Sequence, residues 1–364
     1  MKETFLQLVR LGIGHEASHL PEQVDWEELK ALAEGQGLSG VLADGMEKLP
    51  QEQRPPKPVV LQLIGEVLNG YEYRFELYRR AIAEMAAFYN SHGFKMMVVK
   101  GYACSMDWPK PEHRPTGDID VWQFGQQEAA DAALAAWFKS PNGSKVQGAN
   151  AEIDNSHHHH TVFHWRDFMV ENHYDFLNVH HHKSNVELER ILKELAMDDS
   201  HYVELYGEKV YLPSANLHAL FLTRHASAHF ASTGMNLRNV LDWGFFVEKH
   251  HDEVDWDWLN GVLEKYGMKK FFDCVNAICV EDLGFPPVDG LEYEVDGQLK
   301  DRVLNETLAR EFDGVTPAGL LRRVVFKYRR WRANAWKHKL CYSESMWSAF
   351  WSGVWNHLLK PSSI

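Results

Sequence analysis

The stretch that most restricts the fold of this chain is RPTGDIDVW, residues 114–122, which reads as a β-strand carrying two acids. In a strand, residues i and i+2 project from the same face, so we expect Asp118 and Asp120 to lie about 6–7 Å apart. Two unpaired carboxylates this close repel, and one of them should take up a proton. A cation such as Mg²⁺ relieves the repulsion and keeps open positions for phosphate and water. The pair therefore indicates a metal site; the alternative is a solvated strand end.

Composition excludes several classes of protein. The 364 residues allow two or three domains, and 45% hydrophobic with 24% charged residues is typical of a globular protein with a sizeable core. No run approaches the roughly 18 apolar residues of a membrane helix, and the first 20 residues lack a signal-peptide pattern. A net charge of −13 argues against nucleic-acid binding by the whole surface. We expect a cytoplasmic protein with no membrane contact, whose four cysteines, without a CxxC pair, are reduced buried thiols.

Hydrophobic periodicity divides the chain into three expected regions: 1–90, 91–185 and 186–364. The first is helical, with Tyr71, Phe75 and Tyr78 on the apolar stripe of a helix that follows the loop QRPPKPV. In the second, FKMMVVKG and GDIDVWQF are expected strands, GYACSMDW and QQEAADAALAAWFKS expected helices, and NGSK a turn. TVFHWRDFMVENHYDFLNVH reads as two more strands broken near residues 166–167. The third region is expected to be helical.

Residues on both sides of the aspartate pair fit phosphate chemistry. Lys100 and Gly101 end one predicted strand and begin a helix, where glycine permits close approach and free N–H groups favour phosphate. Arg114 could neutralise a phosphate or pyrophosphate. Glu171 and His173 share one face of a later strand, so Glu171 could be a third acid near the pair and His173 a substrate-side group. Asp167 and Asp175 are its rivals for that position.

These segments together resemble an uncharacterised nucleotidyltransferase family, often found in bacteria, within the polymerase β-like superfamily. The matching blocks, in order along residues 97–243, are VVKG, RPTGDID, HHHHTVFHW, VENHY and RHASAHFASTGMNLRNVLDW. The resemblance implies an α+β fold, with a small mixed-sheet nucleotidyltransferase core flanked by N-terminal helices and a C-terminal helical domain.

The resemblance also implies a reaction. Asp118, Asp120 and Glu171 would hold Mg²⁺ or Mn²⁺ and serve catalysis, while Lys100, Gly101, Arg114 and Gly117 would bind the nucleotide. A nucleotidyl group would pass from an NTP to a hydroxyl of a small molecule, saccharide or protein, with release of pyrophosphate. Better-known members of the superfamily have Gly-Ser or Gly-Gly at the helix start, where this chain has Gly101-Tyr102. That departure is the basis of the rival hypothesis, a degenerate protein that binds nucleotide or a partner without chemistry.

Two histidine runs, residues 157–160 and 180–182, raise the possibility of another metal. Four consecutive histidines in a strand point alternately to two faces, so at most two of them could bind one ion. Tetrahedral zinc needs three or four ligands, and the sequence does not assemble such a set. We expect one or two of these histidines to line the active-site cleft, with a histidine-rich metal-binding protein as a third, weaker hypothesis.

The C-terminal region holds further candidates. His225 and His229, like Arg238 and Asp242, are four residues apart on predicted helices and form either a buried polar network or a substrate-side group. The basic segment LLRRVVFKYRRWRANAWKHK reads as a solvated helix face, with RNA or an acidic partner as the alternative. Three tryptophans at spacing four, Trp347, Trp351 and Trp355, suit packing on the body or a homodimer interface; peripheral membrane contact is a minor alternative.

Overall fold

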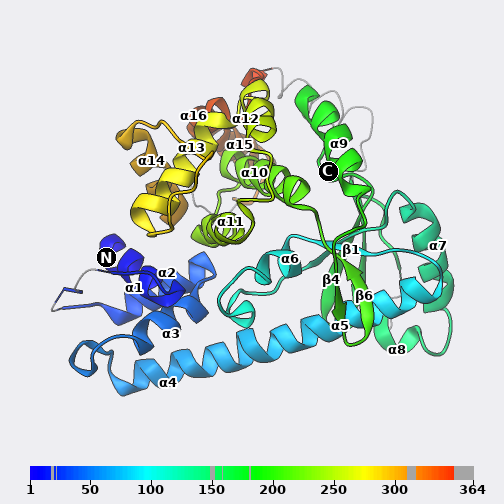
Figure 1. Cartoon of the computed structure of the whole chain (residues 1–364), viewed down its shortest axis with the longest axis horizontal. Helices are drawn as coiled ribbons and strands as arrows, with labels where there is room; N and C mark the ends of the chain where they lie inside the picture. Colours follow the sequence, from blue (N-terminus) through cyan, green and yellow to red (C-terminus); the bar gives the residue numbers. More distant parts are fainter. Residues whose placement is uncertain are drawn as a thin grey trace. The chain divides into compact units, whose positions relative to one another are not determined.

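The computed structural model describes residues 1–17, 20–21, 23–147, 152–157, 159–179, 182–309 and 317–347. The chain forms two compact units (Figure 1). Residues 69–221 form a unit built on a β-sheet, which we call the sheet unit, and residues 1–68 with 222–346 form a helical unit. Along the chain the first boundary falls inside η2, a π-helical segment over Val67–Glu72. The boundaries of the three regions expected from the sequence differ from the boundaries of these two units. That the three regions are functional domains stays a prediction.

The sheet unit confirms the expected α+β class with a small mixed sheet. Its strands are β1 (Met97–Val99), β2 (Ile119–Trp122), β3 (His160–Trp165), β4 (Phe168–His173), β5 (Tyr202–Leu205) and β6 (Glu208–Tyr211). In the described residues they form one sheet in the order β3-β4-β2-β1-β6-β5. The pairs β1–β2, β3–β4 and β5–β6 are antiparallel, whereas β2–β4 and β1–β6 are parallel. The four strands expected from the sequence all lie within this sheet.

The helices of the sheet unit are α5 (Tyr73–Ser91), α6 (Gly101–Ser105), η3 (Pro111–His113), α7 (Gln127–Phe138), α8 (Ser144–Gln147) and α9 (Lys183–Ala196). Residues of α5, α6 and α7 bury one face of the sheet, whereas α9 lines a groove with Trp122 of β2. Figure 1 shows the long helix α5 crossing the direction of the strands. Ile119, Val121 and Val170 form a hydrophobic core with residues of α5 and α7. Since side chains alternate along a strand, Asp120 and Glu171 are left for the opposite face.

One part of the sheet was missed by sequence reasoning. The hairpin of β5 and β6 lies in the region that was expected to be wholly helical. Tyr206 and Gly207 both have positive φ, 53° and 85°, as a two-residue type I′ turn requires. The strands are only four residues each and β5 is largely exposed, so their hydrophobic alternation is weak. A smaller difference is that the turn expected over NGSK ends in α8, which begins at Ser144.

The helical unit joins N-terminal and C-terminal helices. Its helices are α1 (Lys2–Ile13), α2 (Trp26–Gln36), α3 (Ser39–Glu47), η1 (Gln51–Gln53), α4 (Lys57–Glu66), α11 (Leu237–His250), α12 (Trp256–Lys265), α13 (Lys269–Ala277), η4 (Ile278–Asp282), α14 (Gly297–Leu308), α15 (Leu320–Ala333) and α16 (Ala335–Cys341), together with the end of α10 (Ala215–Ser232). The buried Gln36 amide donates to the carbonyls of Thr307 and Leu308 and accepts from the Leu237 N–H. One side chain thus ties α2 to α11 and α14.

Several other expectations concern the packing. The four cysteines are free and buried. Tyr71, Phe75 and Tyr78 are buried, as their helical spacing predicted. In the basic segment Tyr328 stacks on Trp331, with ring centroids 6.0 Å apart, and Arg302 covers the Trp336 ring. Trp351 and Trp355 lie outside the described residues. Within the described part of the chain, every helix is too short or too polar to span a membrane.

Candidate active site

Carboxylates from two neighbouring strands meet on the face of the sheet opposite the core formed with α5 and α7. Asp120 of β2 lies in register with Glu171 of the parallel strand β4, so both side chains project to the same side. Asp120 is 2% exposed, and Asp118, directly before β2, is half-buried. Burial raises the pKa of Asp118, and the charges of Asp120 and Glu171 raise it further. The group whose ligand atoms lie within 4.8 Å of one another consists of Asp120, Glu171 and His173, and the Asp118 carboxyl is outside it.

Asp120 is held between two cations. Its Oδ1 accepts a hydrogen bond from Lys100 Nζ at 2.7 Å and lies 2.9 Å from Nε2 of His173. Burial would raise the pKa of the Asp120 carboxyl, but Lys100 and His173 outweigh it and hold that pKa well below the ordinary value. The carboxylate is therefore ionised at neutral pH, as a metal ligand must be.

His173 has an acceptor at each ring nitrogen. Its Nδ1 lies 3.0 Å from the backbone carbonyl of Asp175 and its Nε2 faces Asp120. Since both partners only accept, both ring nitrogens carry protons and the ring is cationic. Burial lowers the pKa of His173, but Asp120 and Glu171 raise it overall. Burial likewise opposes the charge of Glu171, and its interaction with His173, 3.6 Å away, lowers the Glu171 pKa.

The turn between β1 and α6 brings Lys100 to the carboxylates. Lys100 has φ 52° and ψ −122°, a conformation that residues other than glycine rarely adopt. Gly101 follows, and a Cβ there would lie 2.5 Å from the hydroxyl oxygen of Tyr78. That hydroxyl donates to the backbone carbonyl of Asp118 at 2.9 Å. Glycine at 101 is therefore required for Tyr78 to hold the start of β2 next to α6.

Tyr78 is a supporting residue that sequence reasoning placed in the core without further role. Its ring is 1% exposed within the hydrophobic cluster, while its hydroxyl reaches the aspartate segment. Burial raises the pKa of Tyr78, so the hydroxyl keeps its proton and donates. The available signal was a tyrosine instead of a phenylalanine at a core position, because a buried hydroxyl needs a hydrogen-bond partner.

The remaining nucleotide-side candidates differ in their surroundings. Arg114 is buried, and its Nη1 donates to the Pro115 carbonyl at 3.4 Å. Gly117 is exposed with open space around its Cα, so no close contact explains a glycine there. The Tyr102 side chain is 3% exposed and stacks on Phe75, with ring centroids 6.4 Å apart. Tyr102 therefore packs into the core instead of filling the space at the helix start.

The rivals for the third acid are used elsewhere. Asp167 is exposed in the turn between β3 and β4. The carboxylate of Asp175 pairs with Lys193, and its backbone carbonyl faces His173. Glu171 is the acid that the strand register brings beside Asp120.

Histidines of the first run lie against this acidic face. His160, the first residue of β3, is opposite His173 in the strand register, and its Nε2 lies 3.7 Å from Glu171 Oε1. The rings of His159 and His160 meet edge to face with centroids 4.2 Å apart. Burial and the neighbouring imidazoles lower the pKa of His159 to about 3. Burial lowers that of His160 to about 4, although Glu171 opposes the shift.

Four candidates from the sequence lie in the helical unit. His225 and His229 of α10 have ring centroids 4.3 Å apart. Asp242 of α11 is buried, and with His225 and Asn239 it lines a depression of about 410 Å³. Arg238 is the second residue of the same helix. Because the acidic cluster belongs to the sheet unit, a substrate-side role for these four residues stays a prediction.

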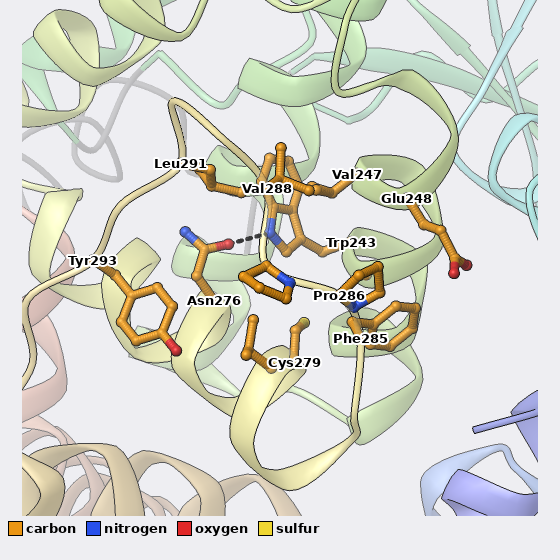
Figure 2. Close-up of a pocket in the computed structure, with 13 residues that line it drawn as sticks. Trp243, Val247, Glu248, Asn276, Cys279, Phe285, Pro286, Val288, Leu291 and Tyr293 are labelled. Atoms are coloured by element: carbon orange, nitrogen blue, oxygen red, sulfur yellow. Dashed lines mark hydrogen bonds between the residues drawn. The ribbon is translucent and has the colours of Figure 1, made fainter. Parts of the chain in front are cut away.

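Two other hollows accompany these sites. In the helical unit a small hollow is lined mainly by apolar side chains from α11, η4 and the following loop (Figure 2). Trp243 lines this hollow, and its indole Nε1 donates a hydrogen bond to Asn276 Oδ1 at 2.6 Å. In the sheet unit a groove of about 1600 Å³ runs between the ends of β2 and β4 and helix α9. Trp122 and Tyr174 line it, two residues after Asp120 and one after His173.

A mixed sheet that presents acids from neighbouring strands, with a lysine and a glycine at an adjoining helix start, is the arrangement that the sequence resemblance implied for a nucleotidyltransferase. The family model described as "Uncharacterised nucleotidyltransferase" matches residues 22–284, well over half of the chain, and the chain belongs to this family. No curated protein and no solved structure gives a significant match. The family resemblance inferred from the five sequence blocks is thereby confirmed.

Proposed function

We propose that this protein is a metal-dependent nucleotidyltransferase that moves a nucleotidyl group from an NTP to a hydroxyl of a small molecule, saccharide or protein, with release of pyrophosphate. The observation that carries the proposal is the register of Asp120 with Glu171 on parallel strands, with Asp118 close by, in a chain of this family. Family membership supports nucleotidyl transfer in general. The metal, the acceptor class and the residue roles are our proposals.

The residues fit a divalent cation. One ligand atom each from Asp120, Glu171 and His173 lies within 4.8 Å of the others. Carboxylate oxygens are the ligands that Mg²⁺ and Mn²⁺ prefer. Asp118, Asp120 and Glu171 would hold the ion or ions, and a bound ion would polarise the α-phosphate and lower the pKa of the acceptor hydroxyl.

The other residues have separate tasks in the proposal. Glu171 accepts the proton of the acceptor hydroxyl, and its lowered pKa keeps it ionised and ready to do so. Lys100 Nζ lies at the carboxylate edge and can turn from Asp120 Oδ1 to a phosphate oxygen. Arg114 adds positive charge for the leaving pyrophosphate, Gly117 leaves room for the nucleotide, and Gly101 offers its backbone N–H at the start of α6. The groove beside Trp122 and Tyr174 is the proposed acceptor side.

A binding-only protein is the second candidate, and one observation favours it. Asp120 is already neutralised by Lys100 and His173, so an ion must compete with two cations for that carboxylate. The original reason for this candidate, the bulk of Tyr102 beside Gly101, is weakened because that side chain is buried against Phe75.

The position of the label in the NTP distinguishes the nucleotidyltransferase from the binding-only protein. Purified protein is incubated with Mg²⁺ or Mn²⁺ and each NTP labelled at the α- or the γ-phosphate, with a cell extract depleted of macromolecules or a protein fraction as acceptor source. We expect α-label to enter the acceptor and γ-label to appear as pyrophosphate, and Asp118→Ala/Asp120→Ala to abolish both. Nucleotide binding without either product supports the binding-only protein. Transfer that persists undiminished in the double variant would end the proposal.

A further inference from the structure

We propose that His159, His160 and His173 bind a transition-metal ion, Zn²⁺ or one of similar preference, beside the carboxylates of Asp120 and Glu171. One ligand nitrogen from each of the three imidazoles lies within 4.8 Å of the others. This inference is independent of nucleotidyl transfer, because it concerns the affinity of the imidazoles for an ion and not the reaction.

His160 lacks the hydrogen bonds that a buried imidazole ordinarily has. The residue is 5% exposed, and its Nδ1 is buried without a hydrogen-bond partner among the described residues. The nearest acceptor that its Nε2 faces is Glu171 Oε1 at 3.7 Å, beyond hydrogen-bond length. Buried polar atoms are nearly always satisfied, and each exception calls for an explanation such as an ion. An ion at these nitrogens would supply the missing partner.

His173 is oriented as metal-binding histidines commonly are. Its Nδ1 faces the Asp175 backbone carbonyl at 3.0 Å, which fixes the ring and directs Nε2 toward the acidic face. A backbone carbonyl on the second ring nitrogen is a recurrent feature around metal-bound histidines. An ion on Nε2 would take the place of the proton that this nitrogen now shares with Asp120.

His159 completes the set because it precedes the strand. Strand alternation would send consecutive histidines to opposite faces, but β3 begins at His160. The carbonyl of His159 accepts from the N–H groups of Tyr174 and Asp175, so its backbone is anchored to the end of β4. Its ring therefore meets those of His160 and His173, with centroids 4.2 and 5.8 Å away. The site takes two ligands from this run, the largest number that the sequence allowed, but they are neighbours because the alternation of faces does not hold at the strand end.

The donor set selects the kind of ion. Three imidazoles with a fourth position open to water or substrate are typical of catalytic zinc sites. Imidazole suits Zn²⁺, Cu²⁺, Fe²⁺ and Ni²⁺, whereas Mg²⁺ prefers oxygen ligands. The Glu171 carboxylate lies 3.7 Å from His160 Nε2 and 3.6 Å from His173 Nε2, so it is beside both imidazoles, while His173 Nε2 also meets Asp120 Oδ1 at 2.9 Å. The softer ion and Mg²⁺ would thus occupy adjoining positions that share Glu171.

Zn²⁺ binding to the full chain, purified without a polyhistidine tag and stripped with a chelator, tests this inference. Isothermal titration with Zn²⁺ in excess Mg²⁺ is expected to give one tight site per chain. His160→Ala and His159→Ala should each weaken it by at least a hundredfold, since removing a ligand has a larger effect than the 10–100-fold of an outer partner. Co²⁺ in place of Zn²⁺ should give visible absorption bands that the same variants lose.

His164→Ala is the matched control, because His164 lies on the same strand but is exposed. It should leave the tight site unchanged. If circular dichroism shows that His160→Ala does not fold, His160→Gln is used in its place, because glutamine keeps most of the side-chain volume. The absence of a tight site would overturn the inference. A tight site that both His160 variants retain would also overturn it, because the metal would then be bound by other histidines. Loss of Mg²⁺-dependent transfer is measured separately, so failure of either proposal is recognised on its own.

Discussion

At the scale of single residues, Lys100 carries the clearest structural cost. Its φ of 52° and ψ of −122° place a side chain in a region that favours glycine, a strain of order 1–3 kcal/mol. The same conformation brings its amine to 2.7 Å from Asp120 Oδ1. Strain that the surrounding structure maintains at a polar cluster is typical of a functional residue.

Replacing Lys100 by glycine or alanine separates the strain from the charge. Both variants lose the amine and leave Asp120 with His173 alone, so we expect both to lose nucleotidyl transfer and to be less stable than the wild type. Lys100→Gly should be more stable than Lys100→Ala by about 1 kcal/mol, because glycine adopts positive φ without strain. Urea unfolding measures the difference. Equal stability of the two variants, or a more stable alanine variant, would show that Lys100 is not strained.

At the scale of elements, the packing of α5 against the start of α6 and β2 depends on the absence of a Cβ at Gly101. Gly101 of α6 lets the Tyr78 hydroxyl of α5 reach the Asp118 carbonyl. The helix, the strand and the lysine-glycine turn were all predictable from sequence, because hydrophobic periodicity and glycine mark them. The hydroxyl contact was not, because it joins residues 40 positions apart that only the folded chain brings together.

The pair gives a coupling experiment. Gly101→Ala places a Cβ 2.5 Å from the Tyr78 hydroxyl oxygen, so we expect it to destabilise the protein by about 1–3 kcal/mol, as overpacking does. Tyr78→Phe removes that oxygen, and the alanine should then be tolerated better in the double variant than in the wild type. Urea unfolding of the four proteins gives the coupling energy. Strictly additive effects would mean that the close contact is relieved elsewhere, and Gly65→Ala, on a helix with open space around it, serves as the control.

The strand register shows which pairs of site residues can be predicted from the sequence and which cannot. The i, i+2 rule placed Asp118 with Asp120 and Glu171 with His173, each within its own strand. Which strands are neighbours, and that β2 and β4 are parallel with Asp120 opposite Glu171, depends on the sheet order. The family resemblance supplied that link before any geometry did. The resemblance included the block that contains His159 and His160, but it did not predict that their rings converge, because that depends on where β3 begins.

At the scale of the whole molecule, the chain is organised differently from its linear pattern. The sequence is read as three consecutive regions, but helices from both ends belong to one unit, in which Gln36 bonds to α11 and α14. Such pairing between segments more than 200 residues apart leaves no periodic signal. The family model covers residues 22–284 and therefore includes parts of both units. The family match thus extends beyond the sheet that carries the acids.

The central claim is that Asp118, Asp120 and Glu171 form the metal and nucleotide site. A crystal of the full-length protein soaked with Mn²⁺ and a non-hydrolysable NTP analogue tests it most directly, because the anomalous signal of manganese locates the ion. We expect an anomalous peak within coordination distance of these three carboxylates, with the triphosphate beside Lys100. An ordered nucleotide elsewhere in the protein, with no manganese at these acids, would contradict it.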